Sequence, residues 1–441
     1  MTGSVASTGR AQARSVGYAY YALGVLMLVY VLNFVDRQVL SILMEPIRRD
    51  LRLNDSQLGL LSGLSFALFY ALAGLPIARL ADTSSRRNII AASLAMWSGM
   101  TALCGLAGGF GQLLAGRVGV AVGEAGSGPA AHSMIADLFP DGRRSTALAV
   151  FSTGVPIGIL IGLVGGGWLN QTFDWRTAFV VVGLPGLAMS ILVMLTLREP
   201  PRGLPLSHPS ARSLGVALKD LWAIRAFKYL TLAAAIHAFT AYGAQQWNPA
   251  FLIRTFHLTT KQAGLGLGLM AGTTGVIGTL GGGWLADRLG RRDPRWYARL
   301  PALLIALSLP FYVAAYLWAP SASAGLSLLV IPSLFGNSFT GPTFAVVQTL
   351  APERSRALAS AVMLFIISLI GFGLGPLTIG IVSDALAPTL GVHSLGRAIS
   401  INAIGDVASV ALFLIAARDL DREFGRPVTR RNENQTTRGK P

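Results

Sequence analysis

The sequence predicts an all-α membrane protein whose twelve transmembrane helices form two six-helix bundles related by pseudo-symmetry. The first observation is composition, since 52% of the 441 residues are hydrophobic and only 13% are charged, against about 25% charged in soluble domains. The second is the recurrence of apolar runs of about 20 residues, the length that crosses a bilayer. The third is a charged loop signature that occurs twice. A soluble core of this length could not bury so much apolar surface, so we expect lipid to be part of the solvent.

The apolar runs divide the chain into an N-terminal segment at 1–17, a bundle at 18–197, a linker at 198–226, a second bundle at 227–418 and a tail at 419–441. Residues 300–352 contain no charged side chain and must hold two helices, with Pro320-Ser321 as the turn. The expected helices are, in order, 18–42, 56–78, 88–107, 111–136, 145–170, 177–197, 227–253, 262–286, 299–319, 325–350, 357–383 and 394–417.

The loops set the expected orientation. If both termini lie on one side with the loops that follow each even-numbered helix, that side collects most of the lysines and arginines, and positive loops stay in the cytoplasm. Both termini, the N-terminal segment, the linker and the tail are therefore expected to be cytoplasmic. The first apolar run is long enough to span and we expect no cleavable signal peptide. The localisation that we expect is the bacterial inner membrane.

Charge and cysteine usage exclude other classes. The net charge of +16 lies in short loops and the tail, which favours membrane orientation over a nucleic-acid partner. Cys104 is the single cysteine, so neither a disulfide framework nor a metal site is expected. Glycine-rich runs such as Gly165-Gly166-Gly167 lack the lysine of a phosphate loop, so we expect no enzyme, no cofactor and a monomer.

The two halves repeat. The segment from Ala78 to Arg87 aligns with the segment from Gly283 to Arg292, and parallel repeats are one of the architectures of secondary transporters. The second copy carries every position of G-x-L-x-D-R-x-G-R-R, so the chain resembles the major facilitator superfamily; the first copy has lost both glycines and one arginine. The resemblance implies a proton gradient as the energy source and a role in gating for the signature residues Asp82, Arg86, Arg87, Asp287, Arg288 and Arg291, although the arginines could merely enforce orientation.

A narrower resemblance rests on four stretches. They are Asn33-Phe34-Val35-Asp36-Arg37, Gly123-Glu124-Ala125, Ile135 to Pro140, and Arg198 to Gly203. Together they are similar to spinster-type transporters, and the resemblance implies proton-coupled export of lysolipids or sphingosine phosphates. The Asp-Arg pair and the Gly123-Glu124-Ala125 stretch also occur in anion:cation symporters of the superfamily, so an organic-anion:proton symporter stays open, as does a receptor or channel.

Four charged residues inside helices are the candidates for proton coupling. A charge at the centre of a bilayer helix costs about 2.5–3.5 kcal/mol. Arg117 and Glu124 lie seven residues apart and share one helix face, roughly 10 Å apart along the axis. With Asp36 and Arg37 they form a cluster of zero formal charge, although adjacent residues point about 100° apart and must have different partners. Separating a carboxylate from its arginine favours proton uptake, so protonation could bias inward against outward states. The alternative is a static ion pair.

The expected substrate contacts combine one cation with neutral polar groups. Because Asn337 stands where the repeat would place a second Glu124, we expect coupling in the first half and a neutral, partly apolar wall in the second. His132 and His237 are lone histidines that could equally be structural, and Asp406 has no evident partner. The expected substrate-binding residues are Asn33, Arg117, His132, His237, Tyr242, Gln246 and Asn337.

Glycines spaced four apart predict close helix contacts. One ridge is formed by Gly154, Gly158, Gly162 and Gly166, and the other by Gly264, Gly268 and Gly272. We expect each ridge to face the other bundle, across the surface that moves during alternating access; the alternative is static packing within one bundle.

Overall fold

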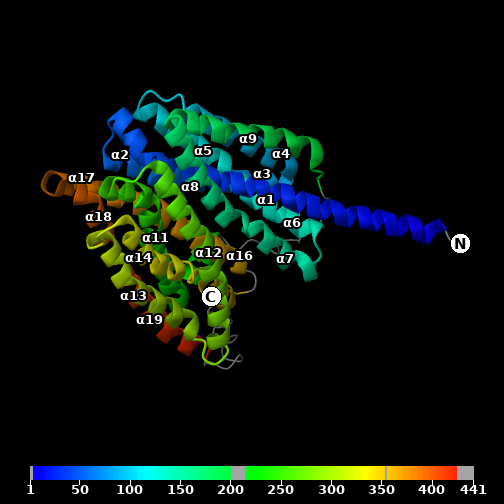
Figure 1. Ribbon diagram of the computed structural model, residues 1–441. Coiled ribbons are helices and arrows are strands. Elements are labelled where there is room, and N and C mark those ends of the chain that lie inside the picture. Colours follow the sequence, from blue (N-terminus) through cyan, green and yellow to red (C-terminus); the bar gives the residue numbers. More distant parts are fainter. Residues whose placement is uncertain (1–2, 200–213, 353–354, 425–441) are drawn as a thin grey trace. The chain divides into compact units, whose positions relative to one another are not determined.

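The computed structural model describes residues 3–199, 214–352 and 355–424, and within these ranges the ordered elements are all helices (Figure 1). The chain forms two compact units. Unit 1 comprises Met1–Ser207 and Gln246–Gly272, and unit 2 comprises His208–Gln245 and Thr273–Pro441. A hairpin from the C-terminal half of the sequence therefore belongs to unit 1.

Unit 1 is built mainly from the first 199 residues. Asn54 and Gln57 form a reciprocal capping box at the start of α2, and Asp174 accepts the backbone N–H of Thr177 at the start of α9, so polar caps satisfy both helix starts. The elements are α1 (Gly3–Leu51), α2 (Asp55–Gly59), the π-helical η1 (Leu60–Leu64), α3 (Ser65–Thr83), α4 (Arg86–Cys104), α5 (Phe110–Glu124), α6 (Ser127–Leu138), α7 (Asp141–Ser152), α8 (Gly154–Thr172) and α9 (Trp175–Thr196), followed by the parts of α11 and α12 that lie within 246–272.

Unit 2 holds the remaining elements. Its core gathers the buried side chains of Phe227, Phe339 and Phe413. The elements are α10 (Leu214–Ala223), the first part of α11 (Arg225–Phe256), the last part of α12 (Thr260–Gly290), α13 (Trp296–Leu317), α14 (Ala322–Gly336), α15 (Thr340–Leu350), α16 (Arg356–Ile367), η3 (Ser368–Leu374), α17 (Gly375–Leu390), η4 (Gly391–His393), α18 (Ser394–Asn402) and α19 (Ile404–Phe424).

Every apolar run expected to form a helix is helical, and among the described residues eight helical stretches are long and apolar enough to cross a membrane. Four expected helices are interrupted: 111–136 between α5 and α6, 145–170 at Thr153 between α7 and α8, 325–350 between α14 and α15, and 394–417 at Ala403. The expected helices 56–78 and 357–383 each contain a π-helical segment, η1 and η3. Apolar content does not reveal such breaks, because the residues around them are as apolar as helix interiors. Two polar segments also differ, since α1 reaches back to Gly3 and the expected linker contains α10.

The glycine ridge of α8 packs against α1, so the expectation that it faces the other bundle is wrong. A Cβ at Gly158 would lie 2.6 Å from the carbonyl oxygen of Val31, and one at Gly162 would lie 2.8 Å from that of Val35; Gly154 and Gly166 meet the same helix. Figure 1 shows α1 and α8 side by side. Absence of side chains lets the two backbones touch within one bundle.

The glycines of α12 pack on α8, so this ridge does face a helix of the other expected bundle. A Cβ at Gly264 would clash with the carbonyl oxygen of Leu163, and Gly268 and Gly272 meet Leu160 on the next turns. The helix α8 is thus held between α1 and the first turns of α12.

Candidate functional site

A buried charged cluster lies where α1, α4 and α5 of unit 1 meet. Asp36 and Arg37 come from α1, whereas Arg117 and Glu124 come from α5. Asp36, Arg117 and Glu124 expose 3%, 2% and 1% of their surface. Buried charges are rarely kept without partners or function, so this cluster is the first candidate site.

Arg37 is the partner of Glu124. Its Nε donates to Glu124 Oε2 at 2.7 Å, and the carboxylate side chain is fully buried. The guanidinium carbon lies 4.9–5.4 Å from the ring centroids of Phe34, Phe66 and Tyr70, where cation–π attraction holds it. The sequence placed Arg37 and Glu124 in one cluster without assigning partners, and the structure pairs them.

Asp36 is hydrogen-bonded to α4 and not to Arg37, the partner of Glu124. The hydroxyl of Thr101 donates to Asp36 Oδ2, and Asp36 Oδ1 is buried without a hydrogen bond. The two neighbours on α1 therefore have different partners, as a helix with about 100° per residue requires. Thr101 could not have been found from charge patterns, because it is a neutral residue in an apolar run.

Arg117 keeps two nitrogens unengaged. Its Nε and Nη1 are buried and make no hydrogen bond in the part of the chain that the structure describes, while its guanidinium carbon lies 5.4 Å from the Phe66 ring centroid. An arginine has five N–H donors in a planar fork that suits carboxylates and phosphates. This side chain can therefore receive an anionic group.

A second network joins three helix ends of unit 1. Arg86, at the start of α4, donates to Asp137 at the end of α6, to Ser133, and to Glu199 beyond α9 at 2.8 Å. Burial opposes ionisation of Glu199, but hydrogen bonds from Arg86, from the backbone of Arg87 and from Ser85 outweigh it and hold the pKa of this carboxyl below its usual value. Asp137 and Glu199 were not among the expected gating residues, and only their place in family motifs marked them.

The other expected gating residues make weaker contacts. Arg87 donates from Nε to its neighbour Asn88, and the side chain of Asp82 lies outside the described residues. In unit 2 the exposed Asp287 accepts from the Tyr297 hydroxyl at 3.4 Å, Arg288 lies over Trp284, and Arg291 donates to the backbone oxygen of Asp287. Of the described signature residues, Arg86 alone is buried among carboxylates.

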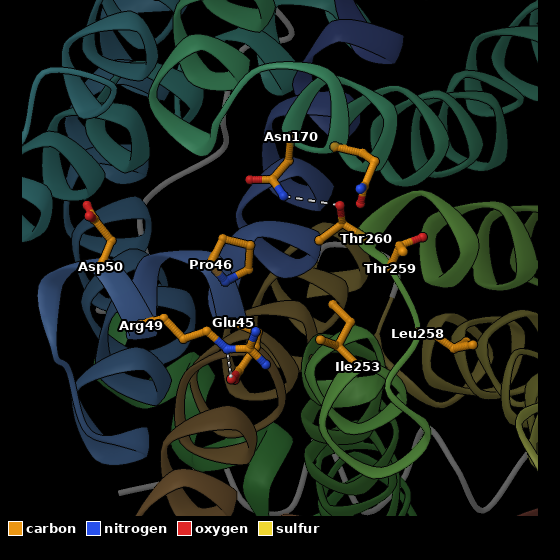
Figure 2. Close-up of a pocket in the computed structure, with 10 residues that line it drawn as sticks. Glu45, Pro46, Arg49, Asp50, Asn170, Ile253, Leu258, Thr259 and Thr260 are labelled. Atoms are coloured by element: carbon orange, nitrogen blue, oxygen red, sulfur yellow. Dashed lines mark hydrogen bonds and ion pairs between the residues drawn. The ribbon is translucent and has the colours of Figure 1, made fainter.

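A third charged group lies at the C-terminal end of α1. Arg254 of α11 donates to Glu45, and its two terminal nitrogens each donate to Asp55 at 2.7 Å. Beside it lies a cavity of about 620 Å³, lined by Glu45, Arg49, Asn170 and Thr260 among others. Figure 2 shows this cavity, with the amide of Asn170 donating to Thr260 at 3.1 Å.

The expected substrate residues are distributed over both units. In unit 1, Asn33 is buried, the exposed His132 contacts the Gly128 carbonyl through Nδ1, and the Gln246 carbonyl accepts from Ser41. In unit 2, Tyr242 stacks on Phe372 with centroids 3.8 Å apart, and the exposed Asn337 follows the end of α14. The two sets belong to separate units.

His237 is not a lone histidine, and the second half is not neutral. Its Nδ1 lies 2.8 Å from Asp406 Oδ1 on α19, and its Nε2 lies 3.1 Å from the Gly336 carbonyl oxygen. Both side chains are about 95% buried. The pairing was missed because the two residues lie 169 positions apart. Among the described residues, no group of three His, Cys, Asp or Glu side chains could hold a metal ion.

Comparison with known proteins places this geometry in context. Residues 26–376 match the family model described as Major Facilitator Superfamily. A protein of Mycolicibacterium smegmatis named MFS-type efflux pump is 37% identical over 91% of this chain and 93% of its own length. The Drosophila melanogaster protein spinster is 27% identical over 87% of this chain and 64% of its own length.

A solved structure has the same fold. The crystal structure of a bacterial homolog to the human lysosomal transporter Spinster, in an inward-facing and unoccupied conformation, superposes with a TM-score of 0.83 at 32% identity. It covers 91% of this chain and 97% of its own.

Proposed function

Because the chain belongs to the major facilitator superfamily, whose members are multi-pass membrane transporters, we propose that it is a proton-coupled secondary transporter of an amphipathic anionic lipid, of the lysophospholipid or sphingoid phosphate type. It works by alternating access from twelve spanning helices, with both termini in the cytoplasm of a bacterium and the chain in its plasma membrane. The observation that carries the proposal is the buried cluster, which combines a closed ion pair, a carboxylate held by one hydroxyl and an arginine with unengaged donors.

The unengaged nitrogens of Arg117 support an anionic head group as the ligand. A phosphate or phosphodiester offers several oxygens to a guanidinium fork. The aromatic side chains around the cluster, Phe34, Phe66 and Tyr70, provide apolar surface beside that head group. The relative named an MFS-type efflux pump supports export as the direction of transport.

Cargo binding would be coupled to proton binding because the cargo anion and the two carboxylates compete for the arginines. A proton on Asp36 removes a negative charge from the neighbourhood of Arg117, which leaves the arginine free for the cargo anion. A proton on Glu124 dissolves its ion pair with Arg37 and releases α1 from α5. Proton binding would thus change both the affinity for an anion and the contact between two helices.

Transport in proteoliposomes tests the proposal. The wild-type protein is expected to move a lysophospholipid in response to an imposed pH gradient, and Asp36→Asn is expected to abolish this response while counterflow without a gradient persists. Asp174→Asn, which retains the cap of α9, is the matched control and should behave as wild type. Unchanged pH-driven transport by Asp36→Asn would contradict the role of Asp36.

The same vesicles separate the alternatives. Organic acids transported in place of lysolipids would favour an anion:proton symporter, with Arg117 binding a carboxylate. Absence of counterflow for every cargo would contradict a carrier and favour a channel or receptor.

A further inference from the structure

The pair formed by His237 and Asp406 has no role in the function proposed above. It lies wholly within unit 2, where α11 meets the start of α19 and the end of α14. His237 exposes 3% of its surface and Asp406 exposes 4%. A buried ionisable pair inside a membrane protein marks a functional site by default.

Both ring nitrogens of His237 face acceptors. Nδ1 faces a carboxylate oxygen at 2.8 Å and Nε2 faces the Gly336 carbonyl oxygen at 3.1 Å. A neutral imidazole has one donor and one acceptor nitrogen, and a backbone carbonyl cannot donate. With a neutral ring and an ionised carboxylate, one of the two contacts would set lone pair against lone pair. Both contacts are hydrogen bonds only when the pair holds two protons.

The helix ends around the pair favour this protonated form. Gly336 is the last residue of α14, so its carbonyl belongs to the negative end of a helix and lacks an intrahelical partner. Asp406 lies in the first turn of α19, where the positive end of a helix favours a carboxylate. The imidazolium and the carboxylate then neutralise one another, which buried charges require.

No other charged residue lies within eight positions of His237 or Asp406 in the sequence. From α13 come the phenols of Tyr312 and Tyr316, with Tyr312 donating to the Ile399 carbonyl. The helices α14 and α15 and the stretch 357–383 carry no charged side chain. The other charged or titratable groups on the surrounding elements α11, α13, α17, α18 and α19 and on the last part of α12 are Arg225, Lys228, Tyr229, Tyr242 and Arg254 on α11, Asp287 and Arg288 on α12, Tyr297 and Arg299 on α13, Asp384 on α17, Arg397 on α18, and Arg418, Asp419, Asp421, Arg422 and Glu423 on α19.

We propose that His237 and Asp406 form a second proton-binding site, in the C-terminal half of the transporter. With two protons, the pair holds the end of α14 and the start of α19 onto α11. After the loss of one proton, His237 can hydrogen-bond Asp406 or the Gly336 carbonyl but not both. A lost contact at Gly336 would release the chain one residue before Asn337. The neighbouring hydrogen bonds from Thr240 to the Asn402 carbonyl and from Ser409 to the Ala233 carbonyl do not depend on this proton, and they keep α18 and α19 on α11.

Nitrogen-15 NMR of histidine-labelled protein in lipid tests the site without transport. The chain has five histidines, and His237→Gln assigns the signal. We expect the imidazolium signal of His237 to persist at pH values at which the exposed His393 is already neutral. The variant Asp406→Asn should abolish this persistence. A neutral single tautomer of His237 throughout the range would overturn the proposal.

Transport measurements test the link to the cycle, which rests on the proposed function. Asp406→Asn and His237→Gln should retain cargo counterflow and lose part or all of the pH-driven component, and Ser409→Ala, a buried hydrogen-bonding control on α19, should lose none. Thermal unfolding checks that each variant is folded. If wild type shows no pH-driven transport, the proposed function fails while the NMR result still decides the proton site. Normal pH-driven transport by folded Asp406→Asn would remove the site from the cycle.

Discussion

At the scale of single residues, two of the four charged residues in the unit 1 cluster form an ion pair and the other two do not. Arg37 bonds one oxygen of Glu124, whereas the other oxygen of Glu124, one oxygen of Asp36 and two nitrogens of Arg117 are buried without hydrogen bonds. Unsatisfied buried groups cost free energy, so a chain that needed only stability would not retain them. The unpaired members are therefore the ones that we assign to cargo and proton.

Removing Arg37 should destabilise the protein more than removing Glu124. Arg37→Gln strands a fully buried carboxylate, and breaking such a pair costs about 3–5 kcal/mol. Glu124→Gln leaves an arginine that is 20% exposed and lies over three rings, which costs less. Thermal unfolding measures both variants, and equal losses of stability would contradict this account.

At the scale of helices, close contacts depend on the missing side chains of glycines as much as on the side chains that are present. The glycine ridge of α8 brings its backbone against the carbonyls of α1. The spacing of these glycines predicted a close helix contact but could not name the neighbour, because glycines four apart serve packing within a bundle and between bundles equally.

A matched pair of glycines on α8 tests this contact. Gly158→Ala places a methyl group 2.6 Å from the Val31 carbonyl oxygen, whereas a Cβ at Gly165 meets nothing within 4 Å. Overpacking typically costs about 1–3 kcal/mol, so Gly158→Ala should lower the unfolding temperature. Gly165→Ala should be neutral or slightly stabilising, since alanine is favoured in helices by up to about 1 kcal/mol. Equal behaviour of the two variants would show that α1 and α8 are not in close contact.

The Arg86 network predicts a pH dependence. The pKa of Glu199 is held below its ordinary value of 4.5 because hydrogen bonds from Arg86, Arg87 and Ser85 outweigh burial. The folded chain thus keeps this carboxylate ionised to lower pH than the unfolded chain, so its contribution is present at neutral pH and is lost as the pH falls from 4.5 through the folded pKa.

Glu199→Gln should accordingly reduce stability at pH 7 and match wild type in acid. Unfolding curves at several pH values measure the difference, and the double variant with Arg86→Gln should destabilise less than the sum of the single variants, since the two residues share one contact. A difference that stays constant into acid would contradict the assignment.

At the scale of the whole molecule, the sequence predicted the helical class, the positions of the apolar segments and the charged residues of α1 and α5. It could not predict partners that lie far apart in the chain. Arg254 meets Glu45 and Asp55 across about 200 positions, and His237 meets Asp406 across 169. Periodicity reports the face on which a residue lies, and pairing between helices depends on tertiary packing that no local pattern records. Helix breaks such as that after Gly336 were missed for the same reason.

The hairpin at 246–272 should depend on Arg254 for its attachment to unit 1. Arg254 is 9% exposed and bonds two buried carboxylates of unit 1, so Arg254→Gln leaves them with the more exposed arginines Arg48 and Arg49 as ion-pair partners. Hydrogen exchange measured by mass spectrometry should rise across 246–272. Arg49→Gln is the control, because Arg49 also bonds Glu45 but is 65% exposed, and exposed pairs contribute little. Equal exchange in both variants would show that Arg254 does not hold the hairpin.

The zero-sum charge of the buried groups has an electrical consequence. Asp36, Arg37, Arg117 and Glu124 sum to zero, and so does the doubly protonated pair of His237 and Asp406. Loss of one proton from that pair gives the interior of unit 2 a net negative charge, and moving one elementary charge through a membrane potential of 100 mV changes the free energy by about 2.3 kcal/mol. With the cluster of unit 1 fully ionised, a carrier whose His237–Asp406 pair holds two protons would reorient almost independently of membrane voltage, whereas reorientation after the pair loses one proton would be voltage-dependent.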